Sequence, residues 1–128
     1  ELITELDLVE WQLRVAAGEL LPITQQKDLR RHGHAIEARI CAENPDANFL
    51  PSTGTLAIYR TPPGAKSFEL DSLRIDSGVR EGDAITPFYD PMIAKLIVWG
   101  EDRAQAIARM REALSRFEAV GPSTNVDF

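Results

Sequence analysis

Short alternating stretches dominate the middle of the chain and predict strands joined by turns. Over residues 33–43 apolar and polar side chains alternate, so that one face would hold Ile36, Ala38, Ile40 and Ala42. Other short apolar stretches between Gly and Pro residues predict strands near 55–61, 67–70, 73–77 and 92–99. The gaps between strands are too short for crossover helices, so we expect hairpins to join most of them.

Helical patterns flank this region on both sides. Asp7, Glu10 and Gly18 have the spacing of a helix start and a helix end, which predicts a short helix over 7–17. A long amphipathic helix is predicted over 102–119, where apolar side chains recur at Ile107, Met110, Leu114 and Phe117. The predicted fold class is therefore α+β, a mainly antiparallel sheet covered by the long C-terminal helix, with a short N-terminal helix.

Composition narrows the class of protein without naming a function. The chain has 128 residues, is 44% hydrophobic and has a net charge of −6, which fits one globular domain and favours neither nucleic acid nor an anionic membrane as a partner. No apolar run approaches the roughly 20 residues that span a bilayer. Cys41 is the only cysteine, which fits a reducing compartment. Because the chain starts at Glu1 and not at Met, we expect a piece of a longer protein.

Arg39 is the strongest candidate for chemistry. It lies on the polar face of the 33–43 strand, with Glu37 two positions and Glu43 four positions away. A guanidinium stays charged at working pH and presents a planar fork of donors, which suits a site for a small anion. Taken alone, however, the pattern favours a plain surface arginine paired with a neighbouring carboxylate.

A second motif, Tyr89-Asp90-Pro91-Met92, has two interpretations. In the first it is a turn that enters a buried strand, because the residue before a proline adopts extended or turn geometry. In the second, Asp90 forms an ion pair near Arg39 and helps to fix it. We give most weight to the turn.

Three segments together resemble a known family. Residues 33–45, 49–52 and 89–97 are similar, in order and spacing, to the C-terminal part of biotin carboxylase, the ATP-dependent component of biotin-dependent acyl-CoA carboxylases and pyruvate carboxylase. The resemblance runs from Glu1 to Phe128, and residues 7–13 most resemble the methylcrotonyl-CoA type. It implies a barrel-sandwich-like C-terminal domain over 23–128, slightly truncated, preceded by a helical tail of the ATP-grasp region over 1–22.

The resemblance also implies an activity and roles for individual residues. Biotin carboxylases are ligases that phosphorylate bicarbonate with ATP and carboxylate biotin through carboxyphosphate. Arg39 matches the strand arginine that contacts bicarbonate and faces the ureido group of biotin. Glu37 and Asp90 would support that arginine, and Pro122 matches the edge of the adenine pocket, although a helix-terminating turn explains Pro122 equally well. No residue is expected to bind a metal, since His32 and His34 lack metal-ligand spacing.

Cofactors and partners follow from the same resemblance. The full enzyme would use ATP and Mg²⁺, with carrier-bound biotin as its substrate, while the 128 residues alone are expected to bind none of them and to be inactive. The implied partners are the N-terminal ATP-grasp portion, the biotin carboxyl carrier domain and the carboxyltransferase component, with a dimer in the full enzyme. We expect no nucleic acid or membrane partner. The expected location is the cytoplasm, or the mitochondrial matrix in a eukaryote.

Two other functions remain open at this stage. The chain could be a non-catalytic assembly or dimerisation domain, with Phe68 or Leu70 exposed on the contact surface. It could instead be a biotinyl or lipoyl carrier module, with Lys95 as the modified residue. Carrier lysines lie on tight hairpins, whereas Lys95 lies inside a strand-like run, so the carrier interpretation is disfavoured.

Overall fold

A four-stranded sheet organises the computed structural model, which describes residues 1–128. Its strand order is β1-β9-β7-β6. The strands are β1 (His34–Cys41), β6 (Lys66–Ser67), β7 (Leu73–Ser77) and β9 (Met92–Gly100). β9 lies between β1 and β7 and is antiparallel to both, whereas β6 runs parallel to β7. The sheet is therefore mixed, and the α+β class is as predicted.

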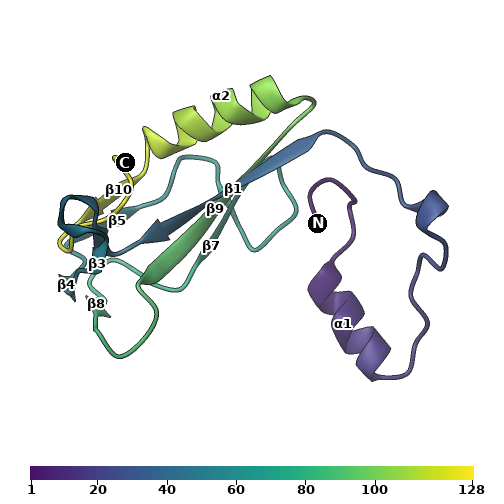
Figure 1. Ribbon diagram of the computed structural model, residues 1–128, viewed down its shortest axis with the longest axis horizontal. Helices are drawn as coiled ribbons and strands as arrows, with labels where there is room; N and C mark the ends of the chain where they lie inside the picture. The colour runs from purple at the N-terminus through teal and green to yellow at the C-terminus, as the bar shows by residue number, and fades with distance from the viewer.

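Six shorter strands form three antiparallel pairs near one end of the central sheet (Figure 1). The pairs are β2 (Glu43–Asn44) with β3 (Leu50–Pro51), β4 (Gly54–Thr55) with β8 (Ala84–Ile85), and β5 (Ile58–Arg60) with β10 (Glu118–Val120). Single 3₁₀ turns occupy Gln26–Asp28 and Pro45–Ala47. The predicted strand over 67–70 is wrong: Phe68 has a φ of 57°, a left-handed conformation that ends β6 after Ser67.

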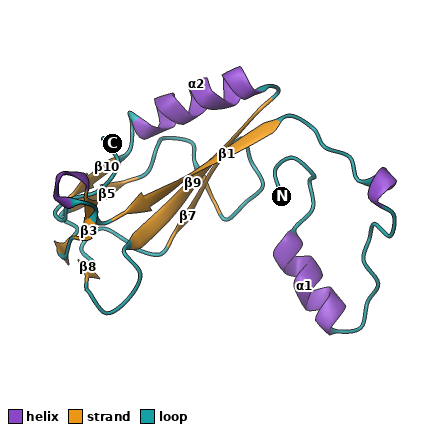
Figure 2. Ribbon diagram, viewed as in Figure 1, coloured by secondary structure: helices purple, strands orange, loops and turns teal.

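The helix α2 (Arg103–Leu114) covers one face of the sheet (Figure 2). The Asp102 carboxylate caps its start by accepting a hydrogen bond from Gln105 N at 2.8 Å. The helix ends five residues earlier than predicted, because the chain turns after Leu114 so that 118–120 can pair with β5. Its buried face also differs from the prediction, consisting of Ala106, Met110 and Ala113, while Ile107 is 40% exposed.

Small residues explain why this face of α2 is the buried one. Ala106 comes so close to the end of β9 that a Cβ on Gly100 would lie 2.6 Å from the Ala106 backbone nitrogen. A large side chain at position 106 would hold the helix away from the sheet. The core between helix and sheet consists of Ile40, Ala42, Ile75, Ile93, Ala94, Leu96, Val98, Met110, Ala113 and Phe117.

The N-terminal helix α1 (Leu8–Ala16) lies apart from the sheet and buries none of its residues (Figure 1). Its predicted boundaries are nearly correct: Asp7 accepts a hydrogen bond from Glu10 N at 2.9 Å, and Gly18 follows the last turn with a φ of 90°. Neither helix is long and apolar enough to cross a membrane.

Candidate functional site

The face of the sheet opposite α2 is polar, and the strand register sets its side chains in rows. Arg39 of β1 is the cross-strand partner of Lys95 on β9, and Lys95 is the partner of Asp76 on β7. One residue pair further along, Glu37 and Arg74 flank Ile97. Cations and carboxylates from three strands are thereby brought onto one surface.

Arg39 is held by a single carboxylate. Its Nε donates to Glu37 Oε1 at 3.2 Å, and 70% of its side chain is exposed. The expected closeness of Arg39 and Glu37 is therefore present, since residues two apart on a strand share a face. Nε is the only guanidinium nitrogen with a hydrogen-bond partner in the chain, so the outer edge of the fork is free to bind an anion.

Asp90 does not pair with Arg39. Its Oδ1 accepts from Met92 N at 2.8 Å, and its carboxylate forms no ion pair with any guanidinium of the chain. A short acidic side chain ahead of a proline folds back onto the backbone two residues on, which closes the turn into β9. The turn interpretation of this motif holds in the structure, and the expected ion pair is absent.

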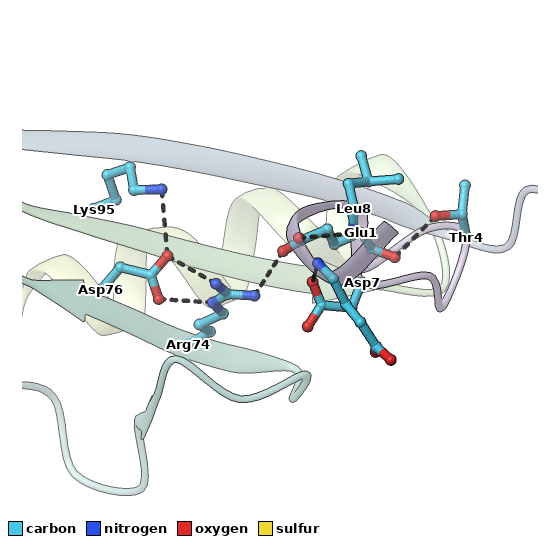
Figure 3. Close-up of polar contacts among 8 residues, drawn as sticks. Glu1, Thr4, Asp7, Leu8, Arg74, Asp76 and Lys95 are labelled. Atoms are coloured by element: carbon cyan, nitrogen blue, oxygen red, sulfur yellow. Dashed lines mark hydrogen bonds and ion pairs between the residues drawn. The ribbon is translucent and has the colours of Figure 1, made fainter. Parts of the chain in front are cut away.

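Sequence reasoning missed a charged network beside Arg39. Arg74 grips Asp76 through two hydrogen bonds, from Nε at 2.7 Å and from Nη2 at 3.0 Å. Lys95 Nζ lies 3.3 Å from Asp76 Oδ2, and Arg74 Nη1 donates to Glu1 Oε2 at 2.8 Å. Figure 3 shows the four side chains in a line from β9 to the N-terminal segment. The spacing Arg-x-Asp within a strand was the available signal, but the contribution of Lys95 depends on register.

Asp76 is the buried centre of this network, with 8% of its surface exposed. Burial alone would raise the pKa of its carboxyl, but the hydrogen bonds from Arg74 and Lys95 outweigh burial and hold that pKa below its usual range. The hydrogen bond to Asp76 likewise raises the pKa of Arg74. Together with Glu37, Ala35, Ile97 and Leu2, the network lines an open pocket of about 230 Å³.

The position of Lys95 contradicts the carrier-module interpretation. The residue lies in the middle of β9, flanked by hydrogen-bonded strands on both sides, and its ammonium is engaged by Asp76. A carrier lysine has to reach out from a hairpin to a modifying enzyme. In this chain Lys95 is a polar member of the sheet.

Pro122 and Cys41 have structural surroundings. Pro122 is buried in the turn after β10, next to Gly54, and is one of the residues lining a separate open pocket of about 530 Å³. Cys41 ends β1 half-buried, and burial raises the pKa of its thiol. No cluster of three or more His, Cys, Asp or Glu side chains capable of holding a metal ion occurs in the chain.

Comparisons with known proteins identify the family. Residues 37–128 match the family described as biotin carboxylase C-terminal domain. The chain is 51% identical to the mitochondrial methylcrotonoyl-CoA carboxylase alpha chain of Dictyostelium discoideum, over 100% of this chain and 18% of that protein. It is 46% identical to the biotin carboxylase of Halalkalibacterium halodurans, over 98% of this chain and 26% of that protein.

A solved structure agrees with these matches. The biotin carboxylase domain dimer of Hydrogenobacter thermophilus 2-oxoglutarate carboxylase, in complex with MgADP, ADP and bicarbonate, superposes with a TM-score of 0.89. That match has 44% identity and covers 98% of this chain and 26% of the other. Fold and sequence thus define a domain of the carboxylase class. The chain belongs to the biotin carboxylase C-terminal domain family, which confirms the resemblance seen in the sequence.

Proposed function

We propose that the chain is the C-terminal part of a biotin carboxylase, which uses ATP and bicarbonate to carboxylate biotin on its carrier. Family membership and the free outer edge of the Arg39 guanidinium support this assignment. The chain spans about a fifth of the length of the carboxylases it matches, at 18% of the first of them. ATP and Mg²⁺ would be bound by the rest of such an enzyme.

Arg39 would act on two successive negative charges. It would first hold bicarbonate, which ATP phosphorylates to carboxyphosphate, the source of CO₂ and phosphate. When the ureido N–H of biotin loses its proton, charge develops on the ureido oxygen, and the same guanidinium would stabilise it. Glu37 would orient the fork through its contact with Nε, leaving the outer nitrogens for the substrate.

The remaining assignments are extensions of this proposal. Residues 23–128 would form the C-terminal domain and residues 1–22 the tail of a preceding ATP-grasp region. Asp90 would support the site by fixing the turn into β9, and Pro122 would touch the adenine edge. Partners would be a biotin carrier domain and a carboxyltransferase component, in an enzyme that dimerises as the Hydrogenobacter domain does.

Substrate and location follow the relatives. Methylcrotonyl-CoA is the acyl substrate class we favour for the parent enzyme, because carboxylases of that type match the whole chain at 51% and 52% identity. Since those two relatives are named as mitochondrial, the matrix is the proposed location in a eukaryote and the cytoplasm in a bacterium.

The test is Arg39→Lys in the full-length parent carboxylase. Lysine keeps the charge and loses the fork, so we expect biotin carboxylation to fall about a hundredfold, with little change in KM for ATP. Arg60→Lys is the matched control, since Arg60 is similarly exposed, at 66%, and also pairs with a glutamate at 2.9 Å. Carboxylation by Arg39→Lys within twofold of the wild type would refute the catalytic role.

A second candidate is an assembly role, supported by Phe68 and Leu70, which are 62% and 47% exposed. Exposed apolar side chains of this size are available to a partner surface. Sedimentation of the parent enzyme with Phe68→Ser should then show a smaller species. An unchanged sedimentation coefficient would remove this candidate.

A further inference from the structure

The segment after β10 returns along the outer edge of β1, and Asn125 bonds there to the backbone around Arg39. Its Nδ2 donates to the Arg39 carbonyl at 3.0 Å, and its Oδ1 accepts from Cys41 N at 2.9 Å. Its own backbone N–H donates to the Cys41 carbonyl at 3.2 Å. These three bonds satisfy groups that point away from β9.

The position of this clamp coincides with an irregularity in the sheet. β1 is an edge strand, paired only with β9, and its register with β9 shifts between Ile40 and Cys41. At a bulge the ladder no longer fixes the backbone on its own, so a second set of bonds has a large effect on local geometry. A primary amide offers a donor and an acceptor on adjacent atoms, which is what the Arg39 carbonyl and the Cys41 N–H require.

The guanidinium itself is weakly held. Its only side-chain partner is Glu37, at 3.2 Å in an exposed position, and exposed ion pairs contribute little to fixing a side chain. The placement of the fork therefore depends on the backbone from which the side chain starts. We propose that Asn125 is a positioning residue for Arg39, which aims the guanidinium by clamping the β1 backbone at the bulge. This inference rests on the catalytic role proposed for Arg39.

Other contacts hold the C-terminal segment in place independently of the amide. Ser123 N donates to Ser52 Oγ at 2.9 Å, and the rings of Phe128 and Phe49 meet edge to face with centroids 5.1 Å apart. The segment should therefore stay docked when the Asn125 side chain is shortened. That separates a positioning role from simple anchoring of the chain end.

The experiment is a double-mutant cycle in the full-length parent carboxylase. Asn125→Ala should lower kcat for biotin carboxylation by up to about a hundredfold, the cost of a misplacement of roughly 1 Å, with an unchanged KM for ATP. In the Arg39→Lys background the same substitution should cost less than about twofold, because its effect passes through the arginine. Ser123→Ala is the control, since Ser123 contacts Ser52 through its backbone N–H, which the substitution keeps.

Asn125→Asp provides a second variant if the alanine variant folds poorly. It keeps the acceptor for Cys41 N and loses the donor to the Arg39 carbonyl, so it should also lower kcat and be masked by Arg39→Lys. Equal losses in both backgrounds, or an unchanged kcat, would overturn the positioning role. Wild-type carboxylation by Arg39→Lys alone would instead refute the proposed function, so the two failures are distinguishable.

Discussion

Asp76 and Lys95 face each other across β7 and β9, with 3.3 Å between carboxylate oxygen and ammonium nitrogen. Arg74 approaches the same carboxylate from the next position on its face of β7 and engages both oxygens. A buried carboxylate with two cations is a stable arrangement only while it stays complete, because removal of one member leaves the others uncompensated. The network therefore links the stability of the sheet to its charge.

We expect Asp76→Ala to lower the free energy of unfolding by about 2 kcal/mol, somewhat less than for a fully buried pair because water still reaches Lys95. The Lys95 side chain is 37% exposed, against 7% for Asp76. Urea denaturation of the chain would measure the change. Asp71→Asn, at an exposed position near the same strand, should have almost no effect. Equal losses for the two variants would show that the network does not stabilise the sheet.

The same carboxylate predicts an acid-sensitive stability. The pKa of Asp76 is lowered in the folded chain, so the folded state binds fewer protons than the unfolded state between the two pKa values. Stability from this group is complete above the unfolded value, about 3.9, and is lost as pH falls through the folded pKa. Urea midpoints measured from pH 6 downward should fall more steeply for the wild type than for Asp76→Asn. Parallel curves would contradict the assignment.

Gly100 lies where α2 starts against the end of β9, and a side chain there has no room. A Cβ would lie 2.6 Å from the Ala106 backbone nitrogen and 3.0 Å from the Gln105 carbonyl carbon. Gly100→Ala should therefore destabilise the chain by about 2 kcal/mol through overpacking, measured as a lower thermal midpoint. Gly78→Ala is the matched control, because its Cβ would meet nothing closer than 3.9 Å. If both variants melt together, α2 can move aside without cost.

Cys41 should react slowly with alkylating reagents near neutral pH. Burial, followed by the nearby carboxylates of Glu43 and Asp90, raises the pKa of the thiol, so little thiolate is present to attack. The rate of iodoacetamide labelling should be several-fold below that of glutathione and should rise as the pH is raised. Labelling as fast as that of glutathione at pH 7 would show that the thiol is neither buried nor shifted.

Local patterns in the sequence predicted the parts of the fold that depend on neighbouring residues. β1, β7, β9 and the capped start of α1 were found because alternation and capping are set within a few residues. β10 was missed because its partner β5 lies 58 residues away at the Arg60–Glu118 pair, and Phe117 continued the helical pattern beyond the true end of α2. Long-range pairing overrode local periodicity there.

The same distinction applies to the site. Arg39 and Glu37 are two residues apart, so their contact followed from strand geometry alone. The Asp76–Lys95 contact needed the register between two strands, and the Asn125–Cys41 contact joins residues 84 apart. Asp90 was misjudged because a nearby backbone N–H competed successfully for its carboxylate. The family resemblance identified the arginine but gave no geometry around it.

The solvated helix at residues 8–16 has a consequence for its own persistence. A nine-residue helix without tertiary contacts is shorter than the roughly 12 to 15 residues that hold together in water, even with a good cap. Amide protons in this segment should exchange with deuterium at rates near those of random coil, while those of β9 stay protected for far longer. Any surface that shields Leu13, now 70% open to water, would slow that exchange and reveal itself by doing so.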